Sequence, residues 1–166
     1  EAKPDLAGFA HYDRMDAALQ PDPSLVQEKW RRREIENYLC QRTTLLAYAE
    51  ALGGEQQGDL FVSTWRNAME DAIARVTAAL STLRKPDPWS PDLKASDEFL
   101  DPLFKEFFQR LGLPNLMRKT DYHTLARHVP SDEPDAEVRE KLDGIVAVAA
   151  RARPRSDEVC TSGSTI

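Results

Sequence analysis

Cysteine is scarce in this chain of 166 residues, which contains only Cys40, inside an apolar helical pattern, and Cys160, in a polar tail. Their spacing fits neither a zinc site nor a disulfide framework, so we expect a reducing, cytoplasmic setting. No apolar stretch approaches the roughly 20 residues that span a bilayer, so no membrane partner is expected. A glycine-rich loop ending in Gly-Lys-Ser or Gly-Lys-Thr is also missing, which excludes a P-loop nucleotide site.

The start of the chain lacks the features of a secretory signal. It begins at Glu1 and has no basic stretch followed by an apolar one, so we interpret it as a piece excised from a longer protein. A net charge of −6 excludes a uniformly basic nucleic-acid-binding surface, although it leaves room for a local basic patch. With 41% hydrophobic and 30% charged residues, the composition is typical of one soluble globular domain.

Most of the chain has helical periodicity. Apolar residues recur at steps of three and four over 34–52, 60–83, 96–111, 121–128 and 135–151. Gly53-Gly54 is expected to end the first helix and Gly112 the third. An apolar run over 6–12 predicts a buried strand, and a further extended piece is expected around 29–31. The pattern therefore predicts a mainly α fold, a multi-helix domain with a short β segment at the N-terminus.

Two of the predicted helices carry distinctive apolar faces. The third is the most aromatic part of the chain, and its face is expected to form core. The last helix is expected to pack through one apolar stripe, with Leu142 and Ile145 as core residues. The aromatic face comprises Phe99, Phe104, Phe107 and Phe108, and the stripe of the last helix comprises Val138, Leu142, Ile145, Val146 and Ala149.

Acidic residues stand where a metal could bind. Asp13 follows the apolar strand, and ligands gather outside the carboxyl ends of strands, so it is placed to bind Mg²⁺ or Mn²⁺; the alternative is that it caps a turn. Glu34 and Glu36 point about 200° apart on a helix, so both face one ion only if Glu34 lies in extended residues before the first turn. The position of Glu34 on a helical wheel, beside the apolar stripe, slightly favours it over Glu36 as the metal ligand. The alternative is that these acids complement the helix dipole.

Cationic residues offer a second set of candidates. Arg31, Arg32 and Arg33 match phosphate oxygens in geometry, and Trp30 offers a stacking face, although three consecutive arginines cannot all point one way. The alternative is a solvated face or pairing with nearby acids. Lys119, considered without its neighbours, is expected to be a surface residue.

Two separated stretches resemble one known family. The run Arg-Glu-Ile-Glu-Asn-Tyr-Leu at 33–39, downstream of the strand that ends in Asp-Arg-Met-Asp at 13–16, resembles the segment after the Asp-x-Asp strand of the Toprim nuclease domain in overcoming-lysogenisation-defect-type ATP-binding defence proteins. Residues 116–126 resemble the late lysine segment of that family, and 137–145 its closing helix. The resemblance covers roughly 5–50 and 115–150. Met15 stands where the family has its second acid, and Asp16 follows it.

The resemblance implies a C-terminal piece of a metal-dependent nuclease acting on DNA in defence against phage or mobile DNA. It implies that the β segment, 1–33, is the remnant of a Toprim-like α/β sheet, that 34–153 is a helical domain and that 154–166 is a mobile tail. ATP would bind only on a missing upstream ATPase domain of the same chain, and a homo-oligomer is left open. Alone, the piece is expected to be inactive. The implied catalytic residues are Lys119, Glu34 and Glu36, the implied Mg²⁺ or Mn²⁺ ligands are Asp13, Asp16, Glu34 and Glu36, and the nucleic-acid contacts are Arg31, Arg32 and Arg33.

The rival hypothesis is a non-catalytic helical interaction or regulatory module. Its acids would be helix caps, and its aromatic helix, 99–108, would dock a partner or a second copy.

Overall fold

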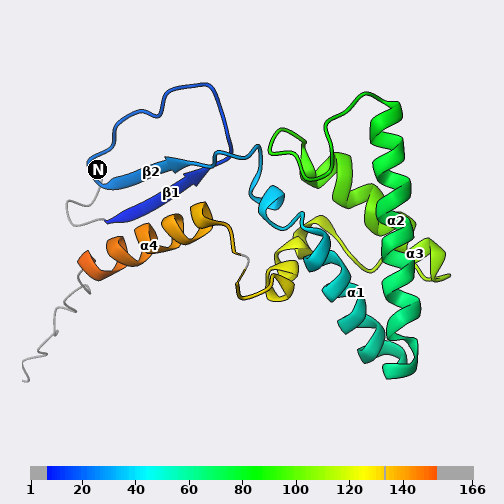
Figure 1. Cartoon of the computed structure of the whole chain (residues 1–166). Coiled ribbons are helices and arrows are strands. Elements are labelled where there is room, and N and C mark those ends of the chain that lie inside the picture. Colours follow the sequence, from blue (N-terminus) through cyan, green and yellow to red (C-terminus); the bar gives the residue numbers. More distant parts are fainter. Residues whose placement is uncertain (1–6, 133, 153–166) are drawn as a thin grey trace, which may run out of the picture.

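A computed structural model describes residues 7–132 and 134–152 (Figure 1). The predicted mainly α fold with a short β segment is confirmed. The two strands and helix α4 lie together in one part of the molecule, and α1, α2 and α3 form the other (Figure 1). The elements are β1 (Gly8–Tyr12), β2 (Leu25–Lys29), α1 (Arg42–Gln57), α2 (Val62–Thr82), α3 (Asp101–Arg110), α4 (Ala136–Arg151), the short 3₁₀ helices η1 (Ile35–Tyr38), η2 (Asp59–Phe61) and η4 (Lys119–His128), and the π-helical turn η3 (Ala95–Leu100).

The helical body is built around a continuous apolar core. Helix α2 contributes Trp65 and Met69, both fully buried, and α3 contributes its aromatic face. The four phenylalanines predicted to form core are confirmed as core, since none of them is exposed. The alternative hypothesis that this aromatic face docks a partner is therefore wrong, because the face is already covered by the chain itself.

Helix α1 differs from its prediction at both ends. The first predicted helix is broken, because Gln41 is extended (φ −127°, ψ 135°) and separates η1 from α1. Asn37 holds the preceding turn in place by donating from Nδ2 to the carbonyls of Ser90 (3.1 Å) and Leu93 (3.0 Å). The predicted stop at Gly53-Gly54 is also wrong: α1 continues to Gln57 and ends at Gly58, whose φ is 85°.

The β segment is a parallel pair. The second strand covers Leu25–Lys29, not 29–31 as expected, and aligns Gly8 with Leu25 and Tyr12 with Lys29. Helix α4 lies against β1, and a Cβ on Gly144 would meet the Phe9 ring at 2.8 Å. Segments more than 100 residues apart in sequence thus form one layered unit. The domain boundary after residue 33 stays a prediction.

Helix α4 packs through a face about a quarter turn around the helix from the one predicted, and Val138 at the edge of the predicted stripe is half-buried. Its buried residues are Glu137, Lys141 and Val148, while Leu142 and Ile145 are exposed. The expectation that Leu142 and Ile145 form core is therefore wrong. The physical reason is that the strands meet α4 through ion pairs and hydrogen bonds, described below.

Two further expectations concern termini and membranes. The predicted tail, 154–166, and Cys160 lie outside the described residues. Within the described ranges, none of the helices combines the length and apolar character needed to cross a bilayer.

Candidate functional site

The two parallel strands end side by side, which brings the first candidate acids together. Trp30 donates its backbone N–H to the carbonyl of Tyr12 (2.9 Å), and Arg14 donates to the carbonyl of Arg33 (3.3 Å). Asp13 therefore lies next to the segment that leads into η1. This is the carboxyl edge of the sheet, where the sequence predicts ligand binding.

Glu34 meets the geometric condition set by its spacing from Glu36. Its backbone is extended (φ −137°, ψ 159°) and precedes the first turn of η1, so the opposite directions of a regular helix do not apply. Its side chain is 8% exposed, and Oε2 accepts the backbone N–H of Ser96 at 2.9 Å. One carboxylate oxygen of Glu34 is therefore committed to the fold.

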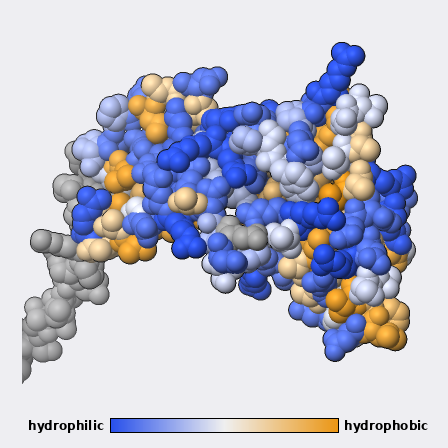
Figure 2. All heavy atoms as spheres, viewed as in Figure 1, coloured by the Kyte–Doolittle hydropathy of each residue, from blue (hydrophilic) through white to orange (hydrophobic). Residues whose placement is uncertain are grey.

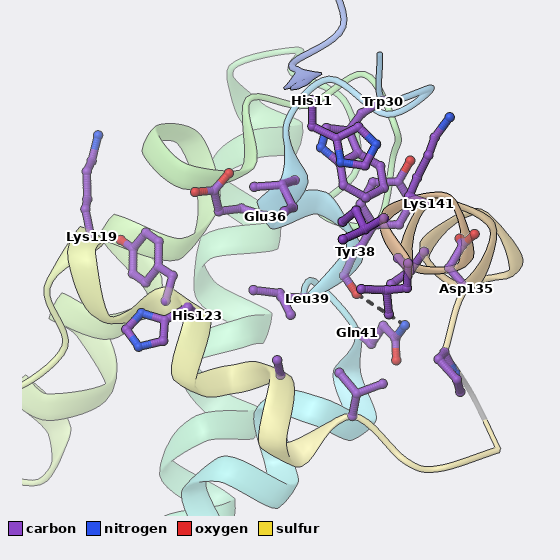
Figure 3. A pocket seen from close by; sticks show the side chains of 18 of the residues that line it. His11, Trp30, Glu36, Tyr38, Leu39, Gln41, Lys119, His123, Asp135 and Lys141 are labelled. Carbon is purple, nitrogen blue, oxygen red and sulfur yellow. Dashed lines mark hydrogen bonds between the residues drawn. The ribbon is translucent and has the colours of Figure 1, made fainter. Parts of the chain in front are cut away.

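Glu36 is the more available acid. It is half-buried and lines a cavity of about 510 Å³ (Figure 3). Burial raises the pKa of the Glu36 carboxyl, and the negative charges of Glu34 and Asp13 raise it further, whereas Lys119 acts in the opposite direction. The helical wheel favoured Glu34 as the metal ligand. In the structure Glu36 is the more accessible of the two carboxylates, because it faces the cavity.

Lys119 belongs to the same neighbourhood but points elsewhere. It is the first residue of η4, as the resemblance implies, and it lines the cavity with Glu36. Its ammonium group pairs with Asp97 and remains about half exposed. Asp16 is exposed on the β1–β2 connection, and its side chain has no hydrogen bond or ion pair within the described ranges. Glu36 and Lys119 therefore line one cavity, and Asp13 and Glu34 lie close enough to affect the pKa of Glu36, whereas Asp16 does not act on it.

The cavity lies between the strand–α4 unit and the helical body. Figure 3 shows Glu36 and Lys119 on one side of it and His11, Asp135 and Lys141 on the other. Its walls are mostly apolar, and a space of this size suits a small molecule or a few side chains. The apolar lining includes Trp30, Ile35, Leu39, Ala126, Val129, Val138, Leu142 and Ile145.

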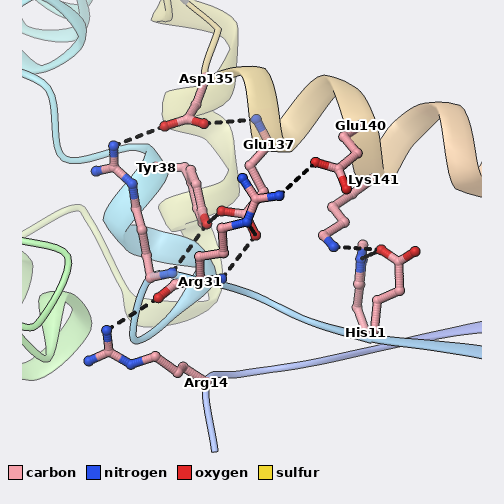
Figure 4. Close-up of polar contacts among 10 residues, drawn as sticks. His11, Arg14, Arg31, Tyr38, Asp135, Glu137, Glu140 and Lys141 are labelled. Atoms are coloured by element: carbon pink, nitrogen blue, oxygen red, sulfur yellow. Dashed lines mark hydrogen bonds and ion pairs between the residues drawn. The ribbon is translucent and has the colours of Figure 1, made fainter.

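The three arginines point to different partners, as their adjacency predicts; Figure 4 shows Arg31 directed toward Glu140. The guanidinium of Arg31 lies 3.0 Å from Glu140, and that of Arg32 lies 2.9 Å from Asp135. Arg33 donates to the carbonyl of Asp92 at 3.2 Å. Pairing with nearby acids, the alternative to phosphate contact, is thus present for Arg31 and Arg32. A role in nucleic-acid binding stays a prediction.

Sequence reasoning missed the polar residues that dock α4. Tyr38 donates its hydroxyl to Glu137, which also accepts the backbone N–H of Arg31 at 2.9 Å (Figure 4). Lys141 Nζ lies 2.6 Å from Glu28 Oε2. Glu137 and Lys141 are one helical turn apart. Because such pairs are common on solvent-exposed helix faces, their spacing did not predict that they are buried. Burial, followed by the Tyr38–Glu137 hydrogen bond, raises the pKa of Tyr38 to about 12, so it keeps its proton at neutral pH.

His11 is packed among rings. Its ring centroid lies 4.5 Å from that of Trp30 and 4.7 Å from that of Phe9. Burial lowers the pKa of His11, and the charge of Lys141 lowers it further, so the imidazole is held neutral against the opposing effect of Glu28. His11 is therefore a packed residue of the strand–α4 unit.

The donor set is compatible with a hard cation. Within the described ranges, no group of three or more His, Cys, Asp or Glu residues is positioned to hold a metal ion. Magnesium, however, keeps several waters and is commonly held by one or two carboxylates together with substrate phosphates. Asp13 and Glu36 supply such carboxylates; burial is the main cause of the raised pKa of Glu36, and the charges of Glu34 and Asp13 add to it, so a nearby cation would favour the ionised carboxylate.

Known proteins offer no guide to this site. No family model, curated protein or solved structure matches the chain.

Proposed function

We propose that this chain is the closing part of a Toprim-like, metal-dependent nuclease within a larger ATP-binding protein. Its substrate would be the phosphodiester backbone of DNA, and its biological setting defence against phage or mobile DNA in the cytoplasm. Its partners would be DNA and an upstream ATPase domain of the same chain, which would carry the ATP. This chain would supply acids and a lysine to a site completed by that upstream part.

One observation carries the proposal: residues distant in sequence meet at one edge of the sheet. Asp13 ends β1, Glu36 stands in η1, and Lys119 begins η4, yet Asp13 and Lys119 both act on the pKa of Glu36. A half-buried carboxylate surrounded by other carboxylates is costly unless a cation compensates it. Helix capping alone does not require Asp13 and Glu34 to lie close enough to Glu36 to raise its pKa.

The residues divide the chemical work as follows. Asp13 and Glu36 would hold Mg²⁺ or Mn²⁺, and Glu34 would support them, since one of its oxygens is bound to Ser96. When bound, such a cation activates water and neutralises phosphate charge. Lys119 begins η4 beside the cavity and would stabilise the charge that builds on the phosphate during cleavage once its ammonium group turns from Asp97 toward the substrate. The neutral, packed His11 takes no part.

Cation binding provides the first test. Titration with Mn²⁺, followed by paramagnetic broadening of amide signals, is expected to broaden residues around 13 and 34–37. Glu36→Gln is expected to weaken binding at least about tenfold, because it removes one of two available carboxylates. Glu55→Gln is the matched control, since Glu55 is exposed on α1. Binding that Glu36→Gln leaves unchanged contradicts the proposed ligand set.

Nuclease activity is tested in the longer protein that contains the upstream region. There, Glu36→Gln and Lys119→Met are each expected to abolish nicking of supercoiled plasmid in Mn²⁺, and Glu55→Gln is expected to preserve it. Nicking that survives both substitutions overturns the catalytic roles proposed for these residues.

The rival function, an interaction module, is favoured by a different observation. The aromatic helix cannot dock a partner, but α4 exposes several large aliphatic side chains. This surface is compatible with the nuclease proposal, because it lies on the other side of the cavity from Glu36 (Figure 3).

A further inference from the structure

The cavity between the strand–α4 unit and the helical body contains a carboxylate without an ion-pair partner. Among the acidic and lysine side chains that line it, only Glu36 forms no ion pair within the described ranges, and no other residue in these ranges donates a hydrogen bond to its carboxylate. The others each pair with a residue outside the lining: Lys119 with Asp97, Asp135 with Arg32, and Lys141 with Glu28. The fold therefore leaves one half-buried negative charge at the cavity uncompensated.

The remaining wall of the cavity is largely apolar. Helix α4 contributes Leu142 and Ile145, which are 55% and 41% exposed, and Ile35 and Leu39 line the cavity from η1 and the residue that follows it. Apolar surface is visible over α4 in Figure 2. Removing such surface from water is favourable, so a ligand with a hydrocarbon body gains free energy by covering it.

Polar contacts of α4 keep this wall directed at the cavity. Rotation of the helix would separate Glu137 from the Tyr38 hydroxyl and from the N–H of Arg31, and Lys141 from Glu28. Because buried charges that lose their partners are strongly destabilising, these contacts fix the rotation of α4. The apolar wall is therefore preformed.

We propose that the cavity binds a small organic monocation, an apolar amine whose ammonium group pairs with Glu36 and whose hydrocarbon body lies on Leu142 and Ile145. The cavity volume of about 510 Å³ falls within the range of roughly 300–1,000 Å³ that is usual for small-molecule sites. An ammonium group supplies the charge that the half-buried carboxylate lacks, and the hydrocarbon body removes the wall from water.

The charge of the site selects this class of ligand over the alternatives. A neutral apolar molecule leaves the Glu36 carboxylate uncompensated, and an anion adds a second negative charge beside it. A hydrated metal ion pairs with the carboxylate but gains nothing from the apolar wall. An apolar amine satisfies both the carboxylate and the wall.

The inference goes beyond the proposed nuclease and stands without it, because the amine needs neither Asp13 nor a metal ion. The two proposals share Glu36, so an amine in the cavity would compete with Mg²⁺ or Mn²⁺ for this carboxylate. Amine binding is measured in EDTA, and Mn²⁺ binding is measured without amine. Failure of one titration therefore leaves the other proposal standing.

NMR titration with three small molecules tests the charge preference. Hexylamine, n-hexanol and hexanoate share a hydrocarbon body and differ in charge. Hexylamine is expected to give saturable shifts of the amides of 35–39 and 141–146 and to bind at least about tenfold more tightly than the other two. Butylamine is expected to bind about tenfold more weakly than hexylamine, because it buries two fewer methylene groups. Hexanol that binds as tightly as hexylamine overturns the proposal, as does an absence of shifts at these amides.

Two variants test the two halves of the site. Glu36→Gln is expected to weaken hexylamine binding at least about tenfold and to leave hexanol binding unchanged. Leu142→Ser is expected to narrow the difference between hexylamine and butylamine, because the longer body loses part of its apolar contact, and to preserve the preference for the amine over the alcohol. Glu55→Gln, at an exposed residue of α1, is the matched control and is expected to bind like the unmodified chain.

Circular dichroism melting checks that each variant is folded. Hexylamine binding that a folded Glu36→Gln variant leaves unchanged overturns the proposed ammonium contact. A folded Leu142→Ser variant that keeps the full difference between hexylamine and butylamine overturns the placement of the hydrocarbon body on α4.

Discussion

The three carboxylates of the candidate site differ in burial and hydrogen bonding, although the sequence makes all three candidate metal ligands. Glu34 is buried and holds the N–H of Ser96, Asp13 is exposed at the end of β1, and Glu36 lies between these extremes beside the cavity. Burial raises the pKa of the Glu36 carboxyl, and the neighbouring acids raise it further. Glu36 is therefore the residue whose ionisation depends most on what occupies the site.

The raised pKa of Glu36 predicts a pH-dependent gain in stability for Glu36→Gln. Between the unfolded and folded pKa values, the folded state binds more protons at this carboxyl, so its contribution lowers stability as pH rises through that window. Above the folded pKa the variant is expected to be more stable than the unmodified chain, by no more than about 1 kcal/mol because the charge is half-exposed and screened.

Urea unfolding at pH 4, 5, 6 and 7 without divalent cations measures this difference. The difference in free energy of unfolding between Glu36→Gln and the unmodified chain is expected to shrink as pH falls and Glu36 becomes protonated in both states. Glu55→Gln is expected to show no such trend. A variant that is less stable at pH 7, or a difference independent of pH, would show that Glu36 is stabilised as a carboxylate.

At the scale of elements, two adjacent glycines in α1 have different roles. A Cβ added to Gly53 would lie 2.7 Å from Trp65 Cγ, whereas one added to Gly54 would lie 3.7 Å from Val62 Cγ2. The first distance requires the fully buried Trp65 to move, and the second is ordinary contact. Gly53 therefore leaves room for the Trp65 side chain of α2, and Gly54 is an ordinary helix-interior position.

Alanine substitutions are expected to have opposite effects at these two positions. Gly53→Ala is expected to lower the free energy of unfolding by about 1–3 kcal/mol, because overpacking displaces the core. Gly54→Ala is expected to raise it by about 0.5–1 kcal/mol, because alanine favours the helix. Urea denaturation of the two variants checks this, with each serving as the control for the other. Similar changes in both would show that Trp65 adapts without cost.

Periodicity predicted the helices because their apolar spacing is local. It placed 60–83 and 135–151 close to α2 and α4, and it identified the aromatic face of α3 as core. It failed where a partner distant in sequence decides the outcome. Gly53 looks like a helix stop unless Trp65 is known to pack on it. Strand β2 contains Gln27, Glu28 and Lys29, and becomes a strand through pairing with β1.

The candidate site was predictable only in part for the same reason. The resemblance named Asp13, Glu36 and Lys119 as site residues, and in the fold Asp13 and Lys119 lie close enough to Glu36 to affect its pKa, while their roles stay a prediction. It gave no indication that Glu34 holds Ser96, or that Arg32 pairs with Asp135. The stripe of α4 was assigned to the core because apolar residues usually face inward. Buried partners for Glu137 and Lys141, which no local pattern reveals, decide the orientation instead.

At the scale of the whole molecule, the two parts are held together by different forces. The helical body buries a continuous apolar core that includes Trp65, Met69 and the α3 phenylalanines. The strand–α4 unit relies on a two-stranded sheet, a stack of rings around His11 and the buried polar contacts of α4. Two strands alone are marginal in water, and buried ion pairs contribute little net stability. The cavity lies between these two parts.

Native-state hydrogen exchange is therefore expected to show two levels of protection. Amides of β1, Phe9–Tyr12, and of α4, 141–148, are expected to have protection factors at least about tenfold lower than those of 69–76 in α2, since regions with few buried apolar contacts open first. Equal protection throughout would mean that the polar contacts bind the strands and α4 to the body as one cooperative unit.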